Sequence, residues 1–179
     1  MKWIKRIGLG ILGFVSAILL IAAFVPKDMK AVKTVVINQP KSLVYGYVVL
    51  LKNQENYSKW ATMDKDMAKS FRGTDGTVGF VSAWESKNDE VGKGEQEITA
   101  IQPGTRLDYA IRFMEPFESK ATSFMQLEEV NAASTKVTWG FESEMAYPMN
   151  MMKLFVDMDE MIGADFQFGL DKLKTTLEK

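Results

Sequence analysis

The longest apolar run of the sequence lies near its start. Residues 7–25 read IGLGILGFVSAILLIAAFV and carry no charged side chain, and Ser16 is the only hydroxyl among them. A helix over these 19 residues is about 28 Å long, close to the hydrocarbon thickness of a bilayer, roughly 30 Å. Trp3 lies before the run as an interfacial aromatic residue, and Pro26 ends it. We therefore predict a transmembrane helix over residues 7–25, between a basic tail over 1–6 and a tether over 26–31.

A cleaved signal peptide is the competing interpretation of this run, because Lys2, Lys5 and Arg6 also form a suitable basic start. The run is longer than the apolar region of a signal peptide, which has about 7–15 residues. A cleavage site near Ala22 and Ala23 also lacks a small residue at its third position upstream. We therefore predict an uncleaved single-pass anchor in the cell membrane. Short basic N-terminal tails usually stay in the cytoplasm, which places the C-terminal domain outside it.

The pattern after residue 31 predicts a folded domain over residues 32–179. The β-branched run Val32–Ile37 predicts a first strand, and Pro40 is placed to begin a helix. The polar stretch 53–60 predicts a second short helix and a loop. The apolar stripe expected on the first helix consists of Leu43, Tyr47, Leu50 and Leu51.

Between residues 68 and 143 the pattern changes to six short strands separated by turn residues. The turns fall at 73–76, 87–90, 102–104, 114–116 and 131–134. Such short connections predict an antiparallel meander. Alternation within two strands predicts one buried face, formed by Leu107, Tyr109, Ile111 and Phe113 in the first and by Val137, Trp139 and Phe141 in the second.

Apolar residues recur every three to four positions over 154–177, which predicts one long amphipathic helix. Its stripe consists of Leu154, Phe155, Met158, Met161, Ile162, Phe166, Leu170, Leu173 and Leu177. The order of strand, helix pair, six strands and long helix predicts an α+β fold. In this fold a curved antiparallel sheet of about seven strands closes around the C-terminal helix.

Composition narrows the chemistry. The chain contains neither Cys nor His, which excludes thiolate nucleophiles, disulfides, imidazole catalysis and most transition-metal sites. We therefore predict no metal and no cofactor, and we assign no catalytic residue. Residues 1–33 carry six basic side chains and one acidic side chain, whereas the remaining 146 carry 16 basic and 22 acidic ones. Nucleic acid is not expected as a partner, because phosphate binding needs clustered positive charge.

Six fragments of the domain follow one another in a familiar order: VVINQP (35–40), NYSKW (56–60), VGFVSAW (78–84), VGKG (91–94), TKVTW (135–139) and DKLK (171–174). Together they resemble the START-like, helix-grip superfamily (SRPBCC), and within it the bacterial polyketide cyclase/dehydrase and lipid-transport group. The resemblance implies a helix-grip fold with a deep apolar cavity between the sheet and the long helix. It implies no particular activity, because the superfamily includes carriers, cyclases and chaperone-like domains.

The predicted function is a membrane-anchored domain that binds a hydrophobic small molecule or lipid in this cavity. The same side chains would otherwise simply fill a core, so both interpretations stay open at this point. The candidate ligand-binding residues are Trp60, Trp84, Tyr109, Phe113, Trp139, Phe141, Met158, Ile162 and Phe166.

Two other classes of function remain as alternatives. A polyketide cyclase/dehydratase-like enzyme would need a buried carboxylate or Tyr directed into the cavity, with a perturbed pKa. Glu95 and Glu97 share a strand face opposite Gln96, Ile98 and Ala100, which predicts that the two glutamates face solvent. A protein-interaction or chaperone-like module would instead show an exposed apolar patch and a collapsed cavity.

Methionine is concentrated near the start of the last helix. Six of the 12 methionines fall within residues 145–161. Since no His or Cys accompanies them, we predict core packing or a pliable gate at the cavity mouth rather than a copper site.

Overall fold

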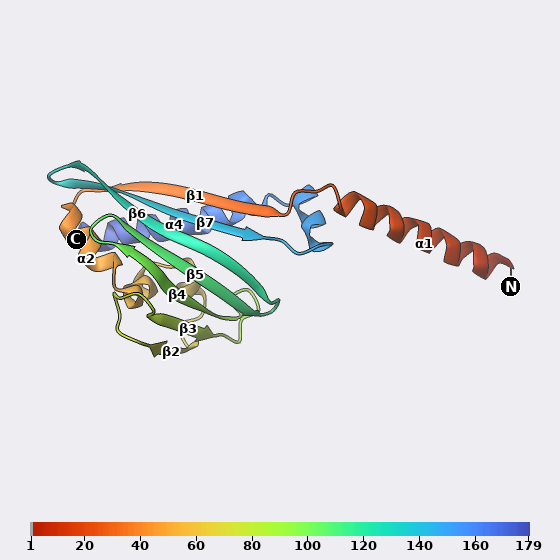
Figure 1. Ribbon diagram of the computed structural model, residues 1–179, viewed down its shortest axis with the longest axis horizontal. Coiled ribbons are helices and arrows are strands. Elements are labelled where there is room, and N and C mark those ends of the chain that lie inside the picture. Colours follow the sequence, from red (N-terminus) through yellow and green to blue (C-terminus); the bar gives the residue numbers. More distant parts are fainter. Residues whose placement is uncertain (1) are drawn as a thin grey trace.

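The computed structural model describes residues 2–179, in which one long helix projects from an α+β domain (Figure 1). Met1, the first residue of the predicted basic tail, lies outside the described residues. The elements are α1 (Lys2–Ala22), β1 (Asp28–Ile37), α2 (Lys41–Val48), the 3-10 helix η1 (Leu51–Asn56), α3 (Lys59–Met63), β2 (Ala68–Arg72), β3 (Val81–Glu85), β4 (Lys93–Gln102), β5 (Arg106–Glu115), β6 (Ser119–Asn131), β7 (Ser134–Glu144), the 3-10 helix η2 (Met149–Leu154) and α4 (Met158–Leu177).

The seven strands form one antiparallel sheet in the order β1-β7-β6-β5-β4-β3-β2. This confirms the predicted α+β layout and the meander of six strands. β1 begins at Asp28, four residues before the predicted Val32, because residues 28–31 pair with residues 141–144 of β7. Most of the predicted tether is therefore strand, and only a short turn separates α1 from the sheet.

The long C-terminal helix covers the sheet as predicted, but it starts later than predicted. The carboxylate of Asp157 accepts a hydrogen bond from the backbone N–H of Glu160 at 2.9 Å, which caps α4 and fixes its first residue as Met158. The single helix expected from residue 154 is therefore wrong, because η2 forms a separate element before the cap. Leu154 and Phe155 are 55% and 81% exposed, so they do not belong to the buried stripe.

The stripe predicted for the first helix is right for Tyr47 and Leu51, which pack on the core, and wrong for its other two residues. Val44 and Val48 are the buried side chains of α2, whereas Leu43 and Leu50 are exposed. The helix ends at Val48, so its buried face is one i, i+4 pair, and Leu50 lies in the link to η1. Leu51 is buried as predicted.

The strand faces agree with the predicted alternation in β5 and β7, where Leu107, Val137 and Trp139 are buried. β4 departs from it. Its pairing with β5 shifts register between Ile98 and Ala100, so Ala100 is exposed although we expected it beside Ile98. A bulge of this kind changes which face the following residues occupy.

The core lies between the sheet and the second half of α4. Leu170 and Leu173 of α4 are fully buried together with Leu107 and Val137 of the sheet. Gly169 permits the close approach, since a Cβ atom there would lie 2.8 Å from the Trp139 ring. This packing leaves the first half of α4 to face a hollow region.

Candidate functional site

A cavity of about 410 Å³ lies between the sheet and helices α3 and α4. Its volume falls within the range of about 300–1,000 Å³ that is usual for small-molecule sites. The side chains around it come from helices η1, α3 and α4 and from all seven strands, so the whole fold is needed to form it. Seven of the predicted binding residues line it, namely Trp60, Trp84, Phe113, Trp139, Phe141, Ile162 and Phe166.

Phe166 organises the aromatic wall of the cavity. Its ring stacks on Trp139 with centroids 4.5 Å apart and meets Trp60 and Phe141 edge-on at 5.8 and 6.0 Å. Offset stacks and edge-to-face pairs are the favoured arrangements of aromatic rings. These contacts join four rings from α3, α4 and β7 into one continuous aromatic wall.

The polar groups inside this wall are mostly paired with each other. The Trp139 indole N–H donates to Ser123 Oγ at 3.2 Å, and the Ser123 hydroxyl donates to the Gly140 carbonyl at 2.8 Å. The Trp84 indole N–H donates to the Val91 carbonyl at 3.3 Å. Both indoles therefore present apolar surface, and not a free donor, to the cavity.

Two predicted residues lie elsewhere. Tyr109 is buried in the hydrophobic core. It lies two residues further from the β5–β6 turn than Ile111, which does line the cavity. Burial raises the pKa of Tyr109 well above its ordinary value, so it stays a neutral phenol. Met158 is the first residue of α4, one turn before the lining residue Ile162, and it does not reach the cavity.

Gln96 is a polar lining residue that we did not assign to the site from the sequence. It lies on β4 with its side chain on the cavity side, and its Nε2 is buried without a hydrogen-bond partner among the described residues. Leaving a buried donor unpaired costs about 1–3 kcal/mol. Such a donor in the lining of the cavity is available to a ligand acceptor. The available signal was the inward position of a polar residue between two outward glutamates.

The sequence of the domain that forms this cavity matches a known family. The sequence profile described as "Polyketide cyclase / dehydrase and lipid transport" matches residues 28–178. The chain belongs to this family. The match begins at the first residue of β1 and ends one residue after α4, so it covers the whole sheet and both walls of the cavity. No curated protein matches the chain.

Solved structures agree on the fold of this polyketide cyclase/dehydrase and lipid-transport family member. The similar structures include a protein from Nitrosospira multiformis, which is 17% identical with a TM-score of 0.56 over 83% of this chain and 95% of that chain. XoxI from Bacillus cereus is 12% identical with a TM-score of 0.60 over 83% and 95%. Ara h 8.0201 is 15% identical with a TM-score of 0.59 over 84% and 97%. These likenesses confirm the START-like, helix-grip fold.

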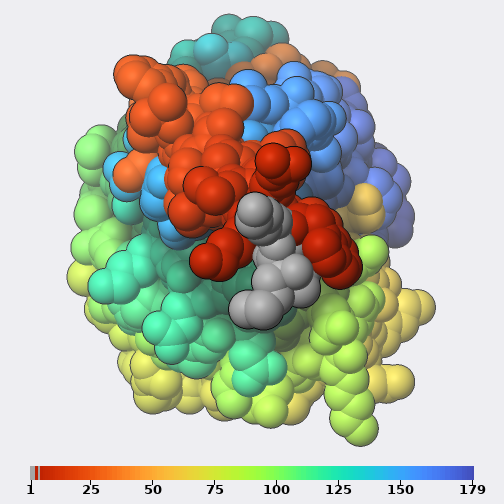
Figure 2. Space-filling model, turned by 90° about the vertical axis from the view of Figure 1, so that its right-hand side faces the viewer, coloured from red at the N-terminus to blue at the C-terminus, as the bar shows by residue number. Residues whose placement is uncertain are grey.

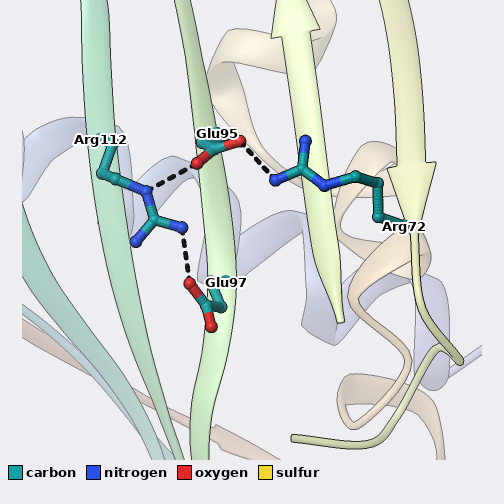
Figure 3. A network of polar contacts seen from close by, with 4 residues as sticks. All are labelled: Arg72, Glu95, Glu97 and Arg112. Carbon is teal, nitrogen blue, oxygen red and sulfur yellow. Dashed lines mark hydrogen bonds and ion pairs between the residues drawn. The ribbon is translucent and has the colours of Figure 1, made fainter. Parts of the chain in front are cut away.

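The outer face of β4 carries the carboxylates that we weighed for an enzyme of this family. Glu95 accepts hydrogen bonds from Arg112 at 2.6 Å and from Arg72 at 2.9 Å, and Arg112 also binds Glu97 at 2.5 Å (Figure 3). Glu95 points to the outer face of the sheet, as expected. Its side chain is only 12% exposed, however, so the expectation that it is open to solvent is wrong. Arg112, and then Arg72, hold the pKa of Glu95 below its ordinary value.

The arrangement provides no support for the enzyme alternative. Glu95 is the less exposed of the two carboxylates in this network, and it faces away from the cavity. The carboxylates that do line the cavity, Glu55, Glu90 and Glu115, are exposed to solvent. Within residues 2–179, no group of three or more acidic side chains is arranged to hold a metal ion.

The methionines of residues 145–161 lie outside the buried core and outside the lining of the cavity. All six are described, none lines the cavity, and Met149, Met152 and Met161 are 44%, 44% and 50% exposed. Our prediction is wrong here because the cap at Asp157 separates η2 from α4 and leaves η2 beside the end of α1.

α1 is long and apolar enough to cross a membrane, and a signal sequence would have the same features. It is attached to the domain through η2 and the turn before it. Asn150 Nδ2 donates to the carbonyls of Ala22 and Val25 at 2.7 and 2.8 Å, and the Tyr147 hydroxyl donates to the Leu19 carbonyl at 3.0 Å. The carbonyls of Leu19 and Ala22 also accept from the backbone N–H groups of Ala23 and Val25, so these side-chain bonds add to the pairing at the end of α1.

Proposed function

We propose that this protein is a membrane-anchored domain that binds a hydrophobic small molecule or lipid in its internal cavity. The observation that supports this most directly is the cavity of about 410 Å³ between α4 and the sheet, with its aromatic wall. Burying apolar ligand surface there is favourable by about 25 cal/mol per Å². The cavity is not collapsed, so the protein-interaction alternative lacks one of the two features that it required.

Gln96 gives the ligand a direction. Its unpaired Nε2 is a buried donor in the lining of the cavity, so a bound molecule gains a hydrogen bond when it places a carbonyl, carboxyl or hydroxyl oxygen there. A few convergent polar groups in an apolar pocket are what fix a ligand's orientation. We therefore propose an amphipathic ligand whose oxygen-bearing end lies at Gln96 and whose apolar part lies against Phe166 and Trp139.

The contacts of α1 support an anchor that stays attached. Asn150 is fully buried, and both acceptors of its Nδ2 belong to the end of α1 and the turn after it. Cleavage near Ala23 would remove the Ala22 carbonyl and expose this side chain. We therefore propose a single-pass protein of the cell membrane, with the N-terminus in the cytoplasm and the domain outside it.

Binding of a ligand in the cavity is tested by comparing two variants of α4. The full chain is purified in mild detergent, and the molecules that it carries are extracted and identified by mass spectrometry. Ile162→Trp places a bulky indole ring in the cavity, whereas Ala164→Trp adds the same ring to the exposed face of α4. We expect one class of amphipathic molecule in the wild type and in Ala164→Trp, and its loss from Ile162→Trp. Lipids bound around α1 are present in all three samples and serve as the internal reference.

Identical extracts from both variants would contradict cavity binding. The anchor has separate measurements: an intact mass that includes residues 1–22 supports the uncleaved form, and a shorter chain contradicts it. A phosphatase reporter fused after Lys179 is expected to be active outside the cytoplasm, and activity confined to the cytoplasm would reverse the proposed orientation.

A further inference from the structure

We infer that the end of the domain next to α1 is a docking surface for a lipid bilayer, onto which the cavity opens. This inference rests on the proposed anchoring by α1, because an inserted α1 brings this end of the domain to the membrane. It adds a second membrane contact, made by the folded domain itself. We call this region the bilayer-facing end; its exposed apolar residues are Phe24, Phe117, Met149, Met152, Leu154 and Phe155.

The attachment of α1 places the bilayer-facing end at the membrane surface. Tyr147 binds the Leu19 carbonyl, six residues before the end of the apolar run at Val25. The three helical residues from Leu19 to Ala22, the end of α1, correspond to about 4.5 Å, and a turn over 23–25 follows. When the apolar run spans the bilayer, the residues around Tyr147 therefore lie within the headgroup and upper acyl region, which is about 5–10 Å deep for interfacial helices.

The β5–β6 turn reaches the same end of the molecule. Ala121 pairs with Ser143, and the backbone N–H of Met145 binds the Lys27 carbonyl, so the start of β6, the end of β7 and the start of β1 lie together. Figure 1 shows this turn and η2 on the side from which α1 projects. Figure 2 views this end along the molecule and shows α1 with segments of β5, β6 and η2 around it.

The apolar side chains of this end are unusually open. Phe24 is 83% exposed, Phe155 is 81% exposed and Phe117 is 70% exposed. Three phenylalanines from three separate segments, exposed at one end of a domain, form the kind of apolar surface that marks a protein or membrane contact. The helix that emerges among them is apolar itself, so the partner that fits both features is a bilayer.

The cavity reaches this surface. Met29, Phe117 and Ser119 line it and all belong to the bilayer-facing end, and Phe117 and Ser119 are exposed to the outside as well. A ligand that leaves past Phe117 therefore enters lipid without crossing water. Because Glu115 and Glu118 flank Phe117 and are exposed, the contact depends on apolar insertion, and anionic lipid is not required.

The absence of Cys from the chain makes a direct test possible, because each introduced Cys is unique. Single variants Phe117→Cys and Phe155→Cys carry an environment-sensitive fluorophore, and the full chain is reconstituted into phosphatidylcholine vesicles that contain spin-labelled phosphatidylcholine. Phe14→Cys reports on insertion of α1. Val130→Cys is the matched control, because Val130 is 55% exposed near the β6–β7 turn at the opposite end of β6.

We expect the spin label to quench the fluorophores at 14, 117 and 155 by about half or more, since interfacial groups lie 5–10 Å deep, and to leave the one at 130 unchanged. Quenching at 14 without quenching at both 117 and 155 overturns the docking surface while the anchor stands. No quenching at 14 overturns the anchor and, with it, this inference. Equal quenching at 130 shows that the domain lies on its side, which also overturns it.

Discussion

The space between α4 and the sheet is filled at one end and hollow at the other. In the closed half, Leu170 and Leu173 are fully buried in one core with Leu107 and Val137. In the open half, one and two turns earlier on the same helix, Phe166 and Ile162 border the cavity. Protein interiors are normally close-packed, and a cavity forfeits dispersion contacts. The packed core and the cavity therefore occupy successive turns of one helix.

The largest expected effect comes from the closed half. Leu173→Ala removes a fully buried side chain, and we expect it to lower the free energy of unfolding by about 3 kcal/mol. Ile162→Ala removes a half-buried side chain that already borders empty space, and we expect a loss of about 1 kcal/mol or less. Urea unfolding of the full chain in detergent, followed by Trp fluorescence, measures both. Equal losses would show that the two halves are packed alike.

The next effect separates stability from binding in the open half. Gln96→Leu removes the unpaired donor, and we expect it to raise the free energy of unfolding by about 1 kcal/mol. It also removes the hydrogen bond proposed for the ligand, so we expect an affinity loss of about tenfold for the molecule identified by mass spectrometry. Gln102→Leu, at the exposed end of the same strand, is the matched control and leaves both values unchanged. Unchanged affinity in Gln96→Leu would remove this residue from the site.

The smallest effect concerns the outer face of the sheet and depends on pH. Arg112 and Arg72 lower the pKa of Glu95 in the folded state, so ionised Glu95 stabilises the fold above its unfolded pKa, about 4.3. That contribution is lost as the pH falls through the lower, folded-state pKa. We expect Glu95→Gln to cost less than about 1 kcal/mol at neutral pH and nothing in strong acid. Thermal unfolding between pH 7 and pH 3 measures the trend, and a cost that grows in acid would contradict it.

The sequence predicted which face of a strand is buried better than it predicted where along the strand the closed core ends and the cavity begins. Alternation identified the buried faces of β5 and β7 because the direction of a side chain in a strand is a local property. It placed Tyr109 and Phe113 on one face, but it contained no information on which of them meets α4 in the closed half and which borders the cavity.

The errors have local causes that a periodicity does not contain. The side-chain cap at Asp157 set the start of α4, and the register shift after Ile98 turned Ala100 outward. Whether Gln96 Nε2 has a hydrogen-bond partner depends on which side chains surround it, and these come from several elements of the cavity. It can be recognised only when all of those elements are in place.

Asn150 couples the orientation of the domain to that of α1. A helix that tilts to match a thinner bilayer normally does so independently of the domain at its end. Here the bonds from Asn150 and Tyr147 hold the last turns of α1 against η2, so a tilt of the helix rotates the whole sheet with it. In the proposed membrane-anchored form, membrane thickness would control how far Phe117 and the cavity mouth enter the lipid, and replacement of Asn150 would release the domain from that control.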